Sequence, residues 1–233
     1  LHSFPTRRSS DLAKIKAFDS KINLSSNNTE AVQGADCIII AVKPWVAETV
    51  VRQISQVVSV PLISIAAGVS TDILKGWLAD NAPAIFRVIP NTAAEYCESM
   101  TFVYESGASA EEKESVLGLL GAVGEVMEID EKMFPAATSL SSCGIAYAMK
   151  YIRASMQGGI TIGFNPQVSE AIVLQTVKGA ACLLEKSGNH PEAEIDKVTT
   201  PGGITIKGIN AMEDNGFTKA VIAGILAGQK AGK

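Results

Sequence analysis

The chain carries three short apolar runs that end in small or helix-starting residues. They are residues 36–44 (DCIIIAVKP), 61–69 (PLISIAAGV) and 84–92 (AIFRVIPNT). Continuous apolar runs of this length are typical of strands that are buried on both faces of a parallel sheet. Helix-like stretches of about a dozen residues separate them, which predicts βαβ units. We therefore expect an α/β fold whose ligands bind at the carboxyl ends of these strands.

The predicted strand ends carry residues suited to a flat ligand. Ala66, Ala67 and Gly68 leave room for a ring, and Lys43 places a cation at the same rim. Helix-start signals follow in this half of the chain, with Ser70-Thr71-Asp72 at one N-terminus and Ser109-x-x-Glu112 as a capping box at another.

The pattern changes near residue 130. No convincing strand follows Asp130, and residues 131–160 read as a helix or a broken helix. Asn165-Pro166 supplies an N-cap and a first-turn proline for a helix reaching about Glu185. This helix is apolar on more than one face. Because so small a helical half cannot bury such faces alone, we expect an intertwined homodimer at least.

Residues 198–208 (VTTPGGITIKG) predict a turn that runs directly into a helix. The start of a helix offers unpaired N–H groups and the positive end of its dipole, and Gly202 and Gly203 let an anion approach that backbone closely. The hydroxyls of Thr199, Thr200 and Thr205 suit a ligand with a ring nitrogen beside a carboxylate. The alternative is that Pro-Gly-Gly only ends one helix and starts another.

Composition narrows the class of protein. The chain has 233 residues, 47% of them hydrophobic, with a formal charge of −4 and a pI near 5.3. It shows no basic cluster typical of nucleic-acid binding, and its apolar runs are shorter than the roughly 20 residues of a membrane helix. Four cysteines stand singly, without the pairing of zinc sites. We expect a soluble cytoplasmic protein with free thiols, no nucleic-acid partner and no membrane partner.

Five motifs carry a family resemblance that extends from about residue 13 to the end of the chain. They are AVKP at 41–44, SIAAGV at 64–69, RVIPNT at 87–92, SLSSCGIAY at 139–147 and VTTPGGITIKGINAMEDNGF at 198–217. In order and spacing they resemble the pyrroline-5-carboxylate reductases. The resemblance implies reduction of 1-pyrroline-5-carboxylate to L-proline, the last step of proline biosynthesis, with NADPH as cofactor and NADH as a possible substitute. It also implies a Rossmann-like sheet over residues 13–130 and an all-helical dimerisation and substrate domain over 131–233, in dimers that often assemble further.

The resemblance assigns roles to particular residues. Thr205 is implied to donate to the imine nitrogen or to relay a proton, and it faces the substrate together with Ile204, while amides from Gly203 onward hold the carboxylate. Alternatives remain for Asn28, which could cap a helix, and for Lys43, which could be a solvated lysine. The implied substrate residues are Thr200, Gly202, Gly203, Ile204 and Thr205, and the implied cofactor residues are Asn28, Ala41, Val42, Lys43, Pro44, Ala66, Ala67 and Gly68.

One family feature is missing from the sequence. Members carry a Gly-x-Gly-x-x-Gly turn near their start, and this chain contains none. Gly118, Gly121 and Gly124 lie on or after a predicted helix with the wrong spacing. Residues 1–12 (LHSFPTRRSSDL) match nothing in the family. Our hypothesis is that they form a foreign or mistranslated leader and that the native first strand, the glycine loop and the native second strand are absent.

The sequence departs from the family pattern at two places. The family usually reads Ser-Gly-Ser-Gly-Pro-Ala-Tyr where this chain has residues 141–147 (SSCGIAY), and it continues Pro-Asn-Thr with proline where this chain has Ala93.

Two alternative functions remain open. One is that of a related reductase acting on another imine or a β-hydroxy acid, for which Lys150 and Lys178 are candidate catalytic lysines by default. The other is a non-catalytic dimerising fragment, which the absent glycine loop favours.

Overall fold

The computed structural model describes residues 22–78 and 82–231, which fall into two compact units. The first unit contains the described residues up to Ser142, and the second is Cys143–Ala231. The proposed leader, residues 1–12, lies outside the described residues. The expected domain boundary near residue 130 stays a prediction from the change in sequence periodicity.

A five-stranded sheet organises the first unit. Strands β1, β2 and β3 are parallel, β4 is antiparallel to β3, and β5 is parallel to β4. Each predicted apolar run holds a strand, although the strands are shorter than the runs. The sequence pattern singled out neither β4 nor β5, and it did not indicate the antiparallel pairing. In sheet order the strands are β1 (Ile38–Ile40), β2 (Leu62–Ser64), β3 (Ile85–Ile89), β4 (Ser99–Ser106) and β5 (Gly124–Glu128).

Helices connect these strands, and two of them begin where the sequence predicted. The Ser70 side chain accepts a hydrogen bond from the Ile73 N–H, and Ser109 and Glu112 form a reciprocal capping box. Both predicted starts are confirmed. The helical segments of this unit are α2 (Asn28–Ala31), α3 (Pro44–Ile54), α4 (Thr71–Trp77), η1 (Thr92–Tyr96), α5 (Ala110–Gly121), η2 (Glu131–Met133), α6 (Phe134–Ala137) and the π-helical η3 (Thr138–Ser142).

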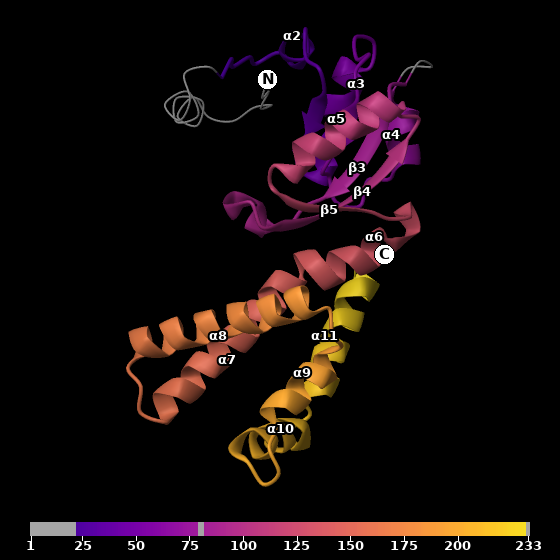
Figure 1. The fold of residues 1–233 in the computed structure, drawn as a ribbon. Coiled ribbons are helices and arrows are strands. Elements are labelled where there is room, and N and C mark those ends of the chain that lie inside the picture. Colours follow the sequence, from indigo (N-terminus) through magenta and orange to yellow (C-terminus); the bar gives the residue numbers. More distant parts are fainter. Residues whose placement is uncertain (1–21, 79–81, 232–233) are drawn as a thin grey trace. The chain divides into compact units, whose positions relative to one another are not determined.

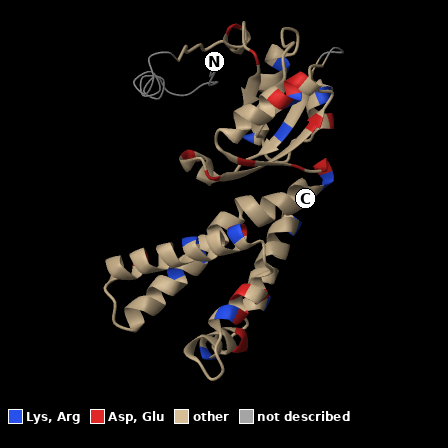
Figure 2. Cartoon of the chain, viewed as in Figure 1, with Lys and Arg blue, Asp and Glu red and all other residues tan. Residues whose placement is uncertain are grey.

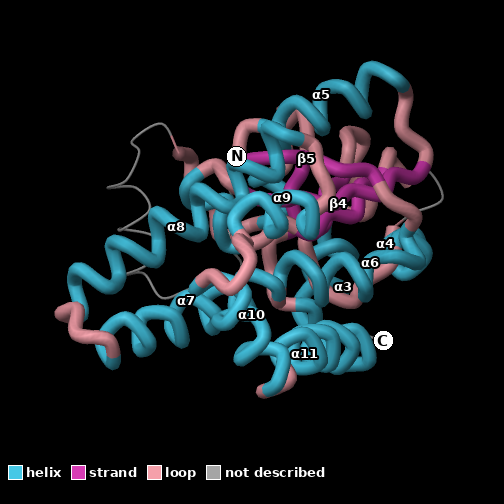
Figure 3. Tube along the Cα trace, turned by 60° about the horizontal axis from the view of Figure 1, so that its bottom comes forward, coloured by secondary structure: helices cyan, strands magenta, loops and turns pink. Residues whose placement is uncertain are grey.

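Apolar side chains on both faces of the sheet explain why the strands read as continuous apolar runs. Neighbouring residues of a strand point to opposite faces. Leu62 and Ile85 therefore pack with α3 and α4, whereas Ile63 and Phe86 pack with α5. In Figure 3 the sheet accordingly lies between α5 and the pair α3 and α4. All four of these side chains are fully buried.

The second unit is entirely helical over its described residues. The side chain of Asn165 accepts from the Val168 N–H, and Pro166 is the first helical residue, so the predicted helix start is confirmed. Helices α7 and α8 pack side by side as a hairpin (Figure 1). The unit comprises α7 (Gly144–Thr161), α8 (Pro166–Ser187), α9 (Pro191–Val198), α10 (Ile204–Asp214) and α11 (Phe217–Ala231).

Gly159 sets the closeness of the α7–α8 contact. A Cβ atom at this position would run into the Ser169 side chain, whose hydroxyl donates to the Met156 carbonyl at 2.9 Å. Ser169 is the only buried residue among the described residues of the second unit. The two backbones can therefore approach here only because position 159 has no side chain.

Replacing Gly159 by alanine tests this contact. Gly159→Ala should lower the free energy of unfolding by about 1–3 kcal/mol, because the added methyl must displace Ser169. The matched control is Gly118→Ala in α5, where a Cβ meets nothing within 4 Å; it should gain about 0.5–1 kcal/mol from helix propensity. Urea titration measures both, and a Gly159→Ala variant as stable as the control would contradict the packing argument.

Candidate functional site

The carboxyl ends of β1, β2 and β3 meet at one edge of the sheet. Ile40 is in register with Ser64, and Ser64 with Arg87. The Ile65 N–H continues the pairing beyond the strands by donating to the Ile40 carbonyl at 3.1 Å. Residues that follow the strands, at 41–44 and 66–69, therefore lie beside each other, as the sequence predicted for a ligand edge.

The segment after β2 turns sharply at Gly68. The Val69 N–H donates to the Ala66 carbonyl at 3.4 Å, and Gly68 has a φ of +76°. A side chain at that φ would be strained, and a Cβ there would meet nothing within 4 Å. Ala66 is buried and Ala67 is exposed. The turn Ala66–Val69 thus exposes backbone and the Ala67 methyl group at this edge of the sheet.

The segment after β1 adds one positive charge to this edge. Ala41 and Lys43 are exposed, Val42 is half-buried, and Pro44 is the first residue of α3. Lys43 is the N-cap of α3 but its side chain makes no capping hydrogen bond. Small residues with one lysine fit a flat ring attached to a phosphate-bearing group.

Asn28 is buried rather than exposed. Its Nδ2 donates to Gln53 Oε1 of α3 at 2.7 Å, and only 7% of the residue is exposed. The helix cap is the preceding residue, Asn27, whose side chain accepts from the Thr29 N–H at 2.9 Å. Asn28 is therefore not the cap that the alternative interpretation required. With Ser26, Asn27, Thr29 and Gln53 it lines a polar pocket of about 340 Å³.

A turn at Thr200–Gly203 begins α10 in the second unit. Pro201 and Gly202 occupy the corner, Gly202 has a φ of +70°, and the Gly203 N–H donates to the Thr200 carbonyl at 2.9 Å. Gly203 is the N-cap and has no side chain with which to cap α10. The free amides of the first turn therefore begin at Ile204. This corrects our expectation that the Gly203 amide itself holds a carboxylate, because the turn already uses it.

The threonine hydroxyls near this turn differ in availability. The Thr199 hydroxyl donates to the carbonyls of Ile195 and Asp196, both at 3.2 Å. Its proton is therefore already used in hydrogen bonds to α9. Within the described residues the Thr200 and Thr205 hydroxyls have no such partner, and both residues are exposed. Ile204 is 90% exposed. Of the three hydroxyls that the sequence grouped together, only those of Thr200 and Thr205 are not already donating within the described residues.

The end of β3 is fixed by Asn91, a residue to which the sequence assigned no role. Its side chain accepts from the Ala93 N–H at 3.0 Å and donates to the Ser141 hydroxyl at 3.1 Å, while its own N–H donates to Ser99 at 3.0 Å. Ser141 belongs to η3, and π-helical turns are frequent at functional sites. Asn91 therefore ties the strand end to the segment that precedes α7.

A second unpredicted cluster surrounds Glu131. Its carboxylate accepts from the Thr71 N–H at 2.7 Å, the Thr71 hydroxyl at 2.8 Å and Arg87 Nη1 at 3.0 Å. Arg87 also lies over the ring of buried Phe134, 4.5 Å from its centroid. Partial burial acts to raise the pKa of Glu131, but the hydrogen bonds from Thr71 and Arg87 outweigh it and the pKa is lowered. The carboxylate is thus held in its charged form.

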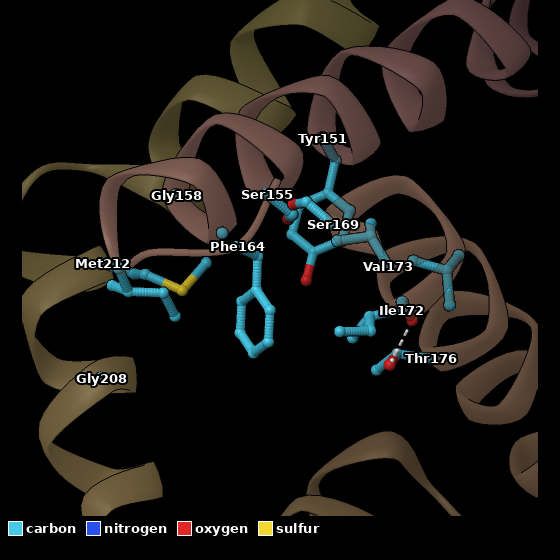
Figure 4. Close-up of a pocket in the computed structure, with 13 residues that line it drawn as sticks. Tyr151, Ser155, Gly158, Phe164, Ser169, Ile172, Val173, Thr176, Gly208 and Met212 are labelled. Atoms are coloured by element: carbon cyan, nitrogen blue, oxygen red, sulfur yellow. Dashed lines mark hydrogen bonds between the residues drawn. The ribbon is translucent and has the colours of Figure 1, made fainter. Parts of the chain in front are cut away.

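Two adjoining apolar cavities open between the helices of the second unit. One, of about 680 Å³, lies among α7, α8 and α10, and the other, of about 620 Å³, lies among α7, α10 and α11. Figure 4 shows the Phe164 ring and the Met212 side chain at the first cavity, with Ile172 and Thr176 opposite. In Figure 2 few charged residues interrupt the α7–α8 hairpin. These helices leave large apolar side chains exposed, among them Met149, Ile162, Phe164, Leu174, Leu183, Ile222 and Leu226.

Some features are absent from the described part of the chain. None of the helices at residues 22–78 and 82–231 is both long and apolar enough to cross a membrane. Within the same ranges no three His, Cys, Asp or Glu side chains are grouped as metal ligands. Cys37, Cys97, Cys143 and Cys182 are free thiols.

Comparison with known proteins identifies the family. The chain is 35% identical to pyrroline-5-carboxylate reductase 2 of Dictyostelium discoideum over 95% of its own length and 79% of that protein's. The chain belongs to the pyrroline-5-carboxylate reductase family. Residues 131–233 match the family described as pyrroline-5-carboxylate reductase dimerisation, and residues 5–68 match the one described as NADP oxidoreductase, coenzyme F420-dependent.

Solved reductases of this family share the fold. The Plasmodium falciparum pyrroline carboxylate reductase with NADP bound superimposes with a TM-score of 0.86 at 28% identity, covering 99% of this chain and 85% of that one. The Streptococcus pyogenes 1-pyrroline-5-carboxylate reductase gives 0.89 at 27% identity, covering 99% and 88%. The expected fold class, a Rossmann-like sheet followed by a helical dimerisation region, is confirmed.

The lowered pKa of Glu131 predicts how the free energy of unfolding depends on pH. Because its pKa is lowered by folding, its contribution is complete above the pKa of the unfolded chain and is lost as the pH falls through the folded value. Glu131→Gln should therefore reduce the free energy of unfolding by about 1–3 kcal/mol at neutral pH. The difference from wild type should shrink toward zero in acid.

Urea titrations across the acid range measure this difference. The control is Glu128→Gln, which breaks a more exposed pair with Lys113 and should cost less stability than Glu131→Gln. A loss in Glu131→Gln that stays constant with pH would contradict the charged state assigned to Glu131.

Proposed function

We propose that this chain reduces 1-pyrroline-5-carboxylate to L-proline with NADPH, the last step of proline biosynthesis, and that NADH can substitute. Family membership supports the reaction, and the relatives are named for it. The observation that carries the proposal in this chain is the uncapped first turn of α10 at Ile204 and Thr205. It supplies amides for a carboxylate beside a free hydroxyl, the two groups that this substrate needs.

The strand edge of the first unit suits the cofactor. Ala41, Ala66, Ala67 and Gly68 leave space for the nicotinamide ring, Val42 and Pro44 shape the same rim, and Lys43 provides a charge for a phosphate. Asn28, in its polar pocket, is the candidate for the adenosine ribose. The Plasmodium falciparum relative was solved with NADP bound, which supports NADPH as the cofactor here.

The chain's own residues hold and protonate the substrate. In the net reaction the imine carbon gains hydride from the reduced nicotinamide and the ring nitrogen gains a proton, so the C=N bond becomes a single bond and the nicotinamide is oxidised. The amides of Ile204 and Thr205 bind the carboxylate, and Thr200, Gly202 and Gly203 form the turn that exposes them. The Thr205 hydroxyl donates to the ring nitrogen or relays a proton from water.

Self-association completes the proposed enzyme. Among the described residues, the second unit buries no apolar side chain, although several are large. A second copy that covers these side chains gives the unit the apolar core it lacks alone. The match of residues 131–233 to a dimerisation family supports a homodimer or a larger homo-oligomer. Four free thiols suit a reducing cytoplasm, where we propose that the enzyme works.

The reaction is tested by following NADPH oxidation with pyrroline-5-carboxylate, on this chain and on the same chain with an upstream glycine-loop segment restored. We expect turnover at least in the restored form, and in the active form a loss of about 100-fold in kcat for Thr205→Ala, because a positioned donor typically contributes that much. Thr205→Ser should restore most of the rate.

The matched control for this test is Thr218→Ala, whose hydroxyl in α11 bonds Glu213 away from the turn. It should retain full turnover. No turnover in either form would refute the proposed reaction, whereas full activity in Thr205→Ala would remove Thr205 from the mechanism and leave the reaction standing.

Light scattering after size exclusion tests the assembly. We expect a dimer or larger oligomer, and Leu183→Glu in α8 should weaken it by about 10-fold or more, because it places a charge on the apolar surface. Leu183 is 60% exposed in the single chain. Leu119→Glu in α5, where the leucine is 45% exposed, is the control and should leave the assembly unchanged. A wild-type monomer at micromolar concentration would overturn this part of the proposal.

A further inference from the structure

The turn Ala66–Val69 is weakly held by its own hydrogen bonds. The Ala66 N–H meets the Ser64 hydroxyl at 3.4 Å, and the Val69 N–H meets the Ala66 carbonyl at the same distance. Both lie at the long limit for hydrogen bonds. At its start the turn is continuous with β2, which is paired on both sides by β1 and β3. At its other end the Val69 side chain, 6% exposed, packs in the core with Leu74 of α4. A hydrogen-bonded anchor at that end must come from the residues that follow the turn.

Glu131 supplies that second anchor. Thr71, which follows the turn after Val69 and Ser70, gives both its N–H and its hydroxyl to the Glu131 carboxylate, at 2.7 and 2.8 Å. These bonds are much shorter than those within the turn, and hydrogen bonds to a charged acceptor are the stronger kind. The contact joins residues that are 60 positions apart in the sequence.

Arg87 in turn fixes the Glu131 carboxylate. Its Nη1 bonds Glu131 at 3.0 Å, and the two side chains are only 12% and 22% exposed. The guanidinium is held from its other side by the ring of Phe134, which is fully buried. Because Arg87 belongs to β3, the Glu131 carboxylate is held at a fixed position relative to the sheet. Thr71 is thereby held in a defined position relative to the strand ends.

We propose that Glu131 is a positioning residue for the cofactor: by holding Thr71 against Arg87, it fixes the turn Ala66–Val69 on which the nicotinamide rests. The proposal rests on the proposed function, because it is that function which places the nicotinamide at this turn. Glu131 belongs to the first unit, whereas the substrate turn at Thr200–Gly203 belongs to the second. Its effect should therefore fall on the cofactor and leave substrate binding unchanged.

Steady-state kinetics of Glu131→Ala, measured on the full chain, test this role. We expect the KM for NADPH to rise by about 5-fold or more, with kcat and the KM for pyrroline-5-carboxylate each within about 2-fold of wild type. Glu131→Gln keeps an acceptor for Thr71 but loses the charge facing Arg87, so its KM for NADPH should be intermediate. Glu128→Gln, which breaks a neighbouring but more exposed ion pair, should behave as wild type.

Hydrogen–deuterium exchange provides a readout that does not depend on activity. Peptides covering residues 65–74 should exchange about 10-fold faster in Glu131→Ala than in wild type, while those in β4 and β5 stay unchanged. Should Glu131→Ala fail to fold, Glu131→Gln carries the same two measurements, with smaller effects in the same direction.

The possible outcomes separate this proposal from the proposed function. Unchanged exchange at residues 65–74, or a fall in kcat with both KM values unaltered, overturns the positioning role and leaves the reaction intact. If neither this chain nor the form with a restored glycine-loop segment oxidises NADPH with pyrroline-5-carboxylate, the proposed function fails. Hydrogen–deuterium exchange at residues 65–74 then decides by itself whether Glu131 fixes the turn Ala66–Val69.

Discussion

The uncapped first turn of α10 is the constraint on which this account depends. A helix start presents amides that need partners, and most helices provide one with a Ser, Thr, Asp or Asn side chain at the N-cap. Here the N-cap is Gly203, and its own N–H is already given to Thr200. The amides that follow, beside the free Thr205 hydroxyl, are left for a ligand or for water. An anion with a neighbouring acceptor satisfies both groups at once.

The two units contribute different halves of the proposed chemistry. The first provides a strand edge with small residues and one lysine, and fixes that edge through part-buried polar contacts at Asn91 and Glu131. The second provides the anion turn on helices that have almost no buried core of their own. Under the proposed self-association, a partner covers the apolar surface of those helices and so supports the helix that carries the turn.

Local signals predicted much of this fold, and long-range contacts account for what they missed. The apolar runs located β1, β2 and β3, and short polar motifs located the starts of α4, α5 and α8, because each depends on neighbouring residues. The antiparallel β4 and the bond from Thr71 to Glu131 depend on residues far apart in sequence. Arg87 lay in a recognised motif, but its partners could not be deduced from it. Likewise, only coordinates show that Asn27 caps α2 while Asn28 is buried.

The most direct test of the central claim is a crystal structure of this chain grown with L-proline and NADP⁺. The account predicts the proline carboxylate within hydrogen-bonding distance of the Ile204 and Thr205 amides, with its ring nitrogen facing the Thr205 hydroxyl. Proline bound elsewhere, with the first turn of α10 covered by protein side chains, would contradict it.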